Sequence, residues 1–336
     1  MWIYKPDYYD RFRCAAGLCP DSCCQQWEVQ VDADAAAYYR SLPGALGDRL
    51  REVLRTEDGN TVMTLVDGRC PMWREDGLCR IQSELGESAL CRTCRDFPRL
   101  THDYGDFVEL GLELSCPEAA KWILSAPYSP LIAGQRPGGG TPAYDREAMG
   151  LLKASRETAL TIISEKTVPV GEALALVLLY GCQAQAELDG GESAPFDTAA
   201  ALAEARELAR PGNPSALLDF CLQLELLTPR WEAMLRNPRP ARWTDAHRAL
   251  ARYLIRRYWL QAVSDNDLYC RVKFITVSCL LIKTLGGDIV STAQLFSKEI
   301  ENDADNVDAI WDAAYSHPAF TDDRLLGLLL SPDGSE

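Results

Sequence analysis

Residues 69–99 read RCPMWREDGLCRIQSELGESALCRTCRDFPR, and residues 17–32 read GLCPDSCCQQWEVQVD. Nine of the thirteen cysteines lie in or near these stretches, within the first 116 residues. Their spacing is that of metal ligands: Cys14-x4-Cys19-x3-Cys23-Cys24, then Cys70-x8-Cys79-x11-Cys91-x2-Cys94, and finally Cys116. Thiolate is a soft ligand that binds zinc, copper(I) or iron–sulfur clusters rather than magnesium or calcium. The pattern therefore predicts a loop-rich N-terminal region that is organised by a metal centre.

The composition is that of a globular protein, with 47% hydrophobic residues in a chain of 336. No apolar run approaches the roughly 18–20 residues of a membrane span, so we expect no transmembrane segment. The first residues, MWIYKPDYYDRFRC, lack the apolar core of a secretion signal, which favours a cytoplasmic protein. In a reducing cytosol, clustered cysteines indicate metal binding or catalysis rather than a disulfide framework.

The formal net charge of −15 argues against a partner that is bound through its phosphate backbone. Nucleic-acid binding proteins gather lysine and arginine on one surface, and this chain has an excess of acidic residues instead. We therefore expect no nucleic-acid partner.

The chain divides by composition into three parts. Residues 1–125 are rich in cysteine, residues 126–145 are dense in proline and glycine and read as an exposed connection, and residues 146–336 read as successive helices. Leu250, Tyr253, Leu254 and Tyr258 recur at helical spacing, as do Val272, Ile275, Thr276 and Cys279. The apolar runs 173–180 and 325–330 are short enough for buried helix. We expect a mainly α fold, with the metal-organised N-terminal region packed on a helical C-terminal domain.

The candidate ligands are thiolates, because His102 is the one histidine near the cysteines. A structural zinc with four cysteine ligands would leave five of the nine unexplained. Nine cysteines suit an iron–sulfur cluster, in one or two metal centres, and zinc is the alternative. The predicted ligands are Cys19, Cys23, Cys24, Cys70, Cys79, Cys91, Cys94 and Cys116.

Basic residues accompany the last close pair of cysteines, at Arg92, Arg95 and Arg99. Guanidinium groups would stabilise the negative charge of a thiolate-bound cluster. They would equally suit the carboxylate of a small-molecule cofactor, and we take the three as cofactor-binding candidates. Solvent-facing arginines on a short helix are the plain alternative.

The same residues resemble the bacterial flagellin lysine-N-methylase family, which is related to a broader group of zinc- or iron-chelating proteins with a CxxCxxCC motif. The resemblance covers roughly residues 14–117. It is carried by the Cys23-Cys24 pair, Trp27, Asp32, the Cys-Pro at 70–71, and the elements GLCRIQ and CRDFPR. Three residues separate Cys19 from the cysteine pair where the broad motif has two, so that group's name fits loosely. The helical remainder carries no decisive motif.

The resemblance implies transfer of a methyl group from S-adenosylmethionine to a lysine of flagellin, in the cytosol. It also implies an oxygen-sensitive [4Fe-4S] cluster held by the cysteine-rich motif, whose matching positions are Cys19, Cys23, Cys24, Cys70, Cys79, Cys94 and Cys116. Cys14 and Cys91 are candidate extra ligands, and the sequence does not assign which four cysteines share a cluster. No GxGxxG motif opens a strand–helix unit, so a Rossmann-type methyltransferase is not expected. The rival functions are a non-catalytic zinc- or iron-binding interaction module and an iron–sulfur redox protein.

No catalytic residue is assigned from the sequence. Asp103, Glu109 and Glu113 lie before Cys116, where one could orient or deprotonate a lysine amine. Several aromatic residues could line a lysine channel or simply pack in the core: Tyr8, Tyr9, Trp243, Tyr253, Tyr258 and Trp259. Core packing is the expected role of Cys182, Cys221, Cys270 and Cys279.

Overall fold

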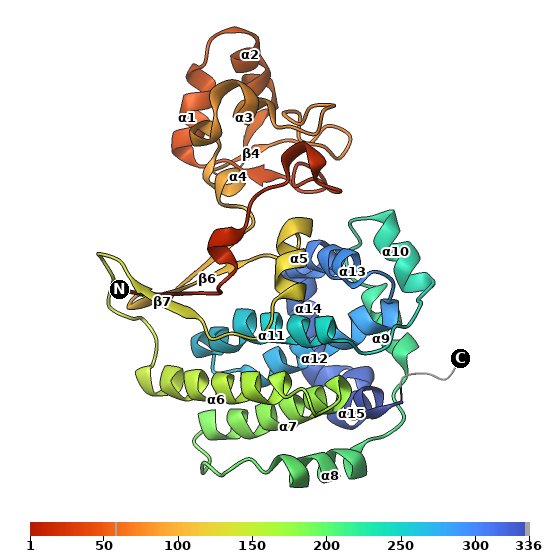
Figure 1. Cartoon of the computed structure of the whole chain (residues 1–336). Coiled ribbons are helices and arrows are strands. Elements are labelled where there is room, and N and C mark those ends of the chain that lie inside the picture. Colours follow the sequence, from red (N-terminus) through yellow and green to blue (C-terminus); the bar gives the residue numbers. More distant parts are fainter. Residues whose placement is uncertain (58, 333–336) are drawn as a thin grey trace.

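Two lobes make up the computed structural model, which describes residues 1–57 and 59–332 (Figure 1). We call residues 13–97 the small lobe and the other described residues the large lobe. The small lobe is inserted between the first and second strands of a sheet that belongs to the large lobe. The chain therefore leaves the large lobe after its first residues and returns to it near residue 98.

The small lobe combines short helices with a three-stranded antiparallel sheet of order β2-β4-β3. Its elements are the 3-10 turn η2 (Ala16–Leu18), β2 (Val29–Gln30), α1 (Ala33–Ser41), α2 (Gly44–Val53), β3 (Leu54–Glu57), β4 (Asn60–Met63), α3 (Arg80–Leu85), the 3-10 turn η3 (Glu87–Ala89) and α4 (Arg92–Asp96). The Asp32 carboxylate accepts hydrogen bonds from the backbone N–H groups of Ala35, at 3.1 Å, and Arg92, at 2.7 Å. One acidic side chain thus caps α1 and also fixes the start of α4.

A four-stranded sheet joins the lobes, in the order β5-β6-β1-β7. Its strands are β1 (Trp2–Lys5), β5 (Arg99–Asp103), β6 (Phe107–Leu112) and β7 (Ile132–Gln135). β1 runs parallel to β6 and antiparallel to β7. The segment 126–145, expected to be an exposed connection, is exposed at β7 but also supplies this edge strand. This strand was not predictable from the sequence, because four residues are too few for a clear alternation.

The large lobe is otherwise helical, as expected. Its helices are α5 (Pro117–Ser125), α6 (Arg146–Ser164), α7 (Val170–Leu188), α8 (Thr198–Leu208), α9 (Pro214–Cys221), α10 (Pro229–Arg236), α11 (Asp245–Tyr258), α12 (Leu268–Leu285), α13 (Ile289–Phe296), α14 (Ala304–Ser316) and α15 (Asp322–Leu330). Short turns complete it: η1 (Tyr9–Arg11), η4 (Trp259–Ser264), the π-helical turn η5 (Ser297–Glu301) and η6 (Pro318–Phe320). The prediction of a mainly α protein is confirmed.

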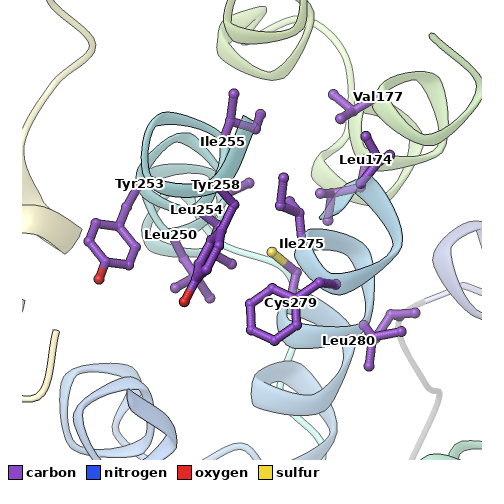
Figure 2. Close-up of a cluster of buried hydrophobic side chains, with 14 of the residues drawn as sticks. Leu174, Val177, Leu250, Tyr253, Leu254, Ile255, Tyr258, Ile275, Cys279 and Leu280 are labelled. Carbon is purple, nitrogen blue, oxygen red and sulfur yellow. The ribbon is translucent and has the colours of Figure 1, made fainter. Parts of the chain in front are cut away.

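Helix α12 lies at the centre of the large lobe and is buried along almost its whole length. Figure 2 shows Leu254 and Tyr258 of α11 in one buried cluster with Ile275 and Cys279 of α12. The helical faces predicted from the sequence are therefore confirmed. The runs 173–180 and 325–330 also form buried helix, in α7 and α15.

The two hydrophobic cores do not follow the three parts into which the chain divides by composition. One core lies in the small lobe. The other contains residues of the helical part together with Tyr8, Phe12, Phe107 and Leu112, all from the first 125 residues. A buried ion pair ties the sheet to the helices, since both Arg156 Nη atoms lie 2.7 Å from the Glu109 carboxylate oxygens.

Two further sequence-based expectations concern membrane spans and the end of the helical domain. None of the helices in the described part has the length and apolar character that a bilayer crossing would require. The predicted helical domain reaches residue 336, and its last four residues lie outside the described part.

Candidate active site between the two lobes

Cysteines from three separate stretches meet in the small lobe. Cys70 and Cys91 are buried in its hydrophobic core, and Cys24, Cys79 and Cys94 pack against that core. The Cys24 thiol is hydrogen-bonded to the thiols of Cys23 and Cys70, and Cys91 is hydrogen-bonded to Cys94. Cys79 and Cys94 both lie within electrostatic range of Cys70. We call these residues the thiol cluster: Cys23, Cys24, Cys70, Cys79, Cys91 and Cys94.

Hydrogen bonds inside the thiol cluster separate the pKa values of neighbouring thiols. The hydrogen bond from Cys24 lowers the pKa of Cys23 to about 7, and that from Cys94 lowers the pKa of Cys91 to about 7. The same contacts raise the pKa of Cys24 and of Cys94. Each pair thus has one thiol that ionises near neutral pH, and thiolate is the form that binds metal.

The other predicted ligands lie beside this cluster. Cys116 is buried in the core of the large lobe, where burial raises its pKa to about 12, and Cys14 and Cys19 are its electrostatic neighbours. Burial also raises the pKa of Cys19, which lies within electrostatic range of Cys23 as well. The eight predicted ligands therefore divide into the six of the thiol cluster and two beside it, Cys19 of the small lobe and Cys116 of the large lobe.

All thirteen cysteines are free thiols. Across residues 1–57 and 59–332, no three Cys, His, Asp or Glu side chains are arranged closely enough together to hold a metal ion. The thiols of the cluster form one chain of contacts, Cys23–Cys24–Cys70, and one pair, Cys91–Cys94. The metal centre therefore stays a prediction.

A cavity of about 510 Å³ lies between the lobes, next to the thiol cluster. The exposed thiol of Cys23 forms part of its wall. The small lobe and the segment that leaves it also supply Gln25, Gln26, Trp27, Arg92, Thr93, Asp96, Phe97 and Arg99. The large lobe supplies Glu113, Ser115, Leu227, Thr228, Lys298 and Asn302.

Local contacts position the aromatic wall of this cavity. The Trp27 indole N–H donates to the carbonyl of Cys23 at 2.9 Å, which fixes the ring beside the cysteine loop. Its ring centroid lies 6.4 Å from that of Phe97. An aromatic surface of this kind attracts cationic groups such as an ammonium or a sulfonium.

Two of the three predicted cofactor-binding arginines reach the cavity. Arg92 begins α4, and the Arg99 guanidinium lies 5.3 Å from the ring centroid of Phe12. Both line the cavity, whereas Arg95 does not and instead forms an exposed ion pair with Asp96 at 3.6 Å.

The three candidate carboxylates have different surroundings. Glu109 is held by Arg156, and Asp103 accepts the backbone N–H of Gly105 at 2.8 Å in the turn after β5. Glu113 lines the cavity. Burial raises the pKa of Glu113, although Arg257 and a hydrogen bond with Asn302 act in the opposite direction.

Asp21 connects the cysteine loop to the large lobe. Its carboxylate accepts hydrogen bonds from Lys298 Nζ at 2.6 Å and from Gln294 Nε2 at 2.7 Å. Gln294 also donates to the carbonyl of Ser115 at 2.9 Å. A second cavity, of about 440 Å³, adjoins this connection and shares Gln25, Gln26 and Thr228 with the first.

The remaining candidates lie away from the interlobe cavity. Tyr8 and Tyr253 line a smaller cavity in the large lobe, Tyr9 is half-buried, and Tyr258 and Trp259 are core residues. Trp243 packs against the same core. Cys221, Cys270 and Cys279 are buried and Cys182 is half-buried, in agreement with the predicted packing role.

Lys298, Thr228 and Asn302 were missed from the sequence. Lys298 lies in η5, Asn302 directly follows η5, and Thr228 lies in the loop before α10. These segments are distant in sequence from the cysteines and carry no motif. Nothing in the sequence pointed to them.

Comparison with known proteins gives relatives for part of the chain. Over 132 residues, 37% of its length, the chain is 32% identical to the flagellar biosynthetic protein FliU of Salmonella muenchen, and the match covers 78% of that protein. It is 32% identical over 132 residues to the lysine-N-methylase of Salmonella typhimurium strain LT2, and 31% identical to that of Salmonella choleraesuis. The match spans 33% of each of these two proteins. No family model matches the chain, and no solved structure matches it.

Proposed function

This chain belongs to the family of the flagellar biosynthetic protein FliU and the bacterial lysine-N-methylases, and from that premise we propose that it is a protein-lysine N-methyltransferase. The proposed methyl donor is S-adenosylmethionine. The proposed substrate is flagellin or a similar filament protein, methylated in the cytoplasm. The observation that carries the proposal is that Cys23, Arg92, Arg99 and Glu113, from separate segments, line one cavity.

The wall of the interlobe cavity suits both reactants. Trp27 and Phe97 offer aromatic faces to the sulfonium and to the lysine ammonium. Arg92 and Arg99 offer guanidinium groups to the carboxylate of the methyl donor. Glu113 has a carboxylate that can accept the proton of the lysine ammonium.

The reaction is a displacement that needs alignment and proton removal. The neutral lysine amine attacks the methyl carbon, a C–N bond forms, the C–S bond breaks, and the electron pair leaves on sulfur as the neutral thioether. The amine must lose its proton before it attacks, and Glu113 is placed to take it. When both reactants are held in one cavity, the bimolecular reaction becomes effectively unimolecular, which lowers its entropic barrier.

The thiol cluster fits the donor set of a thiolate-bound [4Fe-4S] cluster, with zinc as the alternative metal. Four of the six thiols Cys23, Cys24, Cys70, Cys79, Cys91 and Cys94 would hold it, and ligation by Cys23 would bring it to the cavity wall. When bound, such a cluster supplies either a binding point for the methyl donor or a rigid support for the wall. The contacts among these thiols support this assignment.

Anaerobically purified protein tests the function. The protein is incubated with isotopically labelled S-adenosylmethionine and flagellin, and mass spectrometry looks for labelled methyl groups on lysine. We expect labelled methyl-lysine from a brown protein that contains iron. A brown protein that transfers no methyl group favours the redox alternative, and a colourless, inactive zinc protein favours the interaction module.

A matched pair of arginine variants tests the site. Arg99→Gln removes a cavity guanidinium, and we expect it to raise the KM for S-adenosylmethionine about tenfold to a hundredfold, since a charged hydrogen bond is worth about 1.5–3 kcal/mol. Arg95→Gln removes the same charge outside the cavity and leaves KM unchanged. If both substitutions change this KM equally, the interlobe cavity is not the binding site of S-adenosylmethionine.

A further inference from the structure

A smaller cavity, of about 60 Å³, lies in the large lobe between the four-stranded sheet and helix α11. On the sheet, Leu100 is paired with Gly111 across β5 and β6, and the missing side chain of Gly111 leaves room there. On α11, Arg252, Arg256 and Arg257 line the opposite wall. The cavity thus has three guanidinium groups along one side.

Two carboxylates beside the cavity, Glu109 and Glu301, already have cationic partners. Glu109 is bound through both oxygens by Arg156 of α6. Glu301 of η5 pairs with Arg257 at 3.3 Å and accepts the Tyr258 hydroxyl at 2.9 Å. Burial, followed by the charge of Arg257, lowers the pKa of His102, so this side chain is neutral at pH 7.

Arg252 and Arg256 donate their hydrogen bonds to neutral backbone carbonyls. Arg252 Nη2 donates to the carbonyl of Ala126 at 3.1 Å, and Arg256 Nη2 donates to that of Ser129 at 2.5 Å. Within the described residues neither arginine forms an ion pair, and the buried Nε of Arg256 has no hydrogen-bond partner. The ring of Tyr128 lies 5.7 Å from the Arg256 guanidinium. Both arginines are half-buried. The carboxylates within electrostatic range, Asp245 and Glu157, form their ion pairs with Arg248 and Arg156 instead. Partial burial of two cations without an ion pair is costly, and a bound anion would offset that cost.

We propose that this cavity binds a small oxyanion between Arg252 and Arg256. Its volume holds roughly four to six water molecules at about 10–15 Å³ each, a size compatible with the five heavy atoms of phosphate or sulfate. A carboxylate is also negatively charged and has acceptor oxygens, so a carboxylate-bearing metabolite is the other source of this chemistry. The site lies apart from the interlobe cavity and does not depend on the proposed methyl transfer.

Isothermal titration calorimetry with the whole protein tests the site, in a low-chloride buffer free of oxyanions. Phosphate, sulfate and acetate are titrated separately, and their order of affinity distinguishes tetrahedral oxyanions from carboxylates. We expect binding at micromolar to millimolar concentration, weakened at least tenfold in Arg256→Gln. Gly111→Val fills the cavity while every arginine stays in place, and it should weaken binding as much. A Cβ at Gly111 meets only Leu100, at 3.8 Å, so the strand accepts it.

Arg236→Gln is the matched control, because Arg236 is an exposed arginine paired with Glu232 on α10. It should bind the anion like the unmodified protein. The proposal is overturned if none of the three anions binds, if Arg236→Gln weakens binding equally, or if Arg256→Gln and Gly111→Val bind normally.

Chemical modification of the unaltered protein covers variants that fail to fold. Phenylglyoxal reacts with accessible arginines, and peptide mass spectrometry locates the products. The tightest-binding anion should slow the modification of Arg252 and Arg256 and leave that of Arg236 unchanged. Equal rates with and without the anion would refute the site.

Discussion

Glu113 combines contact with the interlobe cavity and a pKa that burial raises above its usual 4.5. A general base acts only when it is ionised, so activity should be lost as pH falls through this raised pKa. We predict that Glu113→Gln lowers kcat about a hundredfold and removes the acidic limb of the kcat/KM profile. The measurement is the rate of methyl transfer between pH 5 and about 9, a range chosen around the usual carboxyl and amine pKa values.

Asp96→Asn is the matched control for Glu113, because Asp96 lines the same cavity but its side chain is 56% exposed. It should leave the acidic limb in place. If Glu113→Gln keeps the wild-type pH profile, Glu113 is a structural residue and not the base.

Cys24 contacts two thiols of the cluster at once. We predict that Cys24→Ala lowers the iron or zinc content of anaerobically purified protein about tenfold. Cys182→Ala removes a half-buried thiol in α7 and should keep the full metal content. Metal analysis by plasma mass spectrometry provides the readout, and equal metal content in the two variants would contradict the proposed ligand set.

At the scale of single residues, sequence reasoning selected residues mainly on the small-lobe side of the interlobe cavity. Metal-ligand spacing selected thiols that lie together in the small lobe, and charge selected Arg92 and Arg99, which line the interlobe cavity. Their roles stay predictions. It did not separate Glu113 from Glu109, because only the fold shows that Arg156 holds Glu109. Lys298 could not be predicted, because it comes from a segment that is distant in sequence from the cysteines.

At the scale of elements, helices were predictable and strands were not. The apolar spacing of α11 and α12 extends over several turns and gives a clear period. β1 and β7 have four residues each, and they pair with each other across more than 120 intervening residues. Such pairing is set by the tertiary fold, and local sequence does not indicate it.

The crossing of α7 and α12 depends on Gly181. A Cβ at this position would lie 2.6 Å from both methyl carbons of Val272, which is buried in α12. We predict that Gly181→Ala lowers the free energy of unfolding by about 1–3 kcal/mol, because the helices must move apart. Urea unfolding, followed by circular dichroism, measures the change.

Gly150→Ala is the control for this crossing. Gly150 lies in α6, and a Cβ there meets no atom within 4 Å. Alanine has the higher helix propensity, so this variant should be about 0.5–1 kcal/mol more stable than the wild type. A stabilising Gly181→Ala would mean that the two helices pack differently.

At the scale of the whole molecule, Asp21 links the lobes. Burial acts to raise the pKa of Asp21, but hydrogen bonds from Lys298 and Gln294 outweigh it and hold the pKa below its usual 3.8. A lowered folded-state pKa means that the link stabilises the fold at neutral pH and is lost as pH falls below that value. The contribution is about 0.5–1 kcal/mol, because both side chains are partly exposed.

We therefore predict that Asp21→Asn loosens the lobes at pH 7 and lowers methyl transfer, since both lobes form the cavity wall. Small-angle X-ray scattering should show a larger radius of gyration. Asp48→Asn removes an ion pair within the small lobe and should leave the radius unchanged. An unchanged radius for Asp21→Asn would show that other contacts hold the lobes together.

The division into lobes was the least predictable feature of the whole molecule. Composition changes near residue 125, but Phe12, Phe107 and Cys116 pack in the large-lobe core. A hydrophobic core is defined by contacts in space. The boundaries of an inserted lobe are therefore not visible in the amino-acid composition. The clustering of the thiols could be predicted from the sequence, whereas the large-lobe wall of the cavity opposite them could not.

β1 has a consequence for how the protein can be handled. The ribosome makes this strand about a hundred residues before its parallel partner β6, so the nascent segment waits with unsatisfied backbone groups while the inserted lobe emerges. Trimming residues 1–5 would also separate β6 from β7, since β1 lies between them. Affinity tags and truncations are therefore better placed at the opposite terminus.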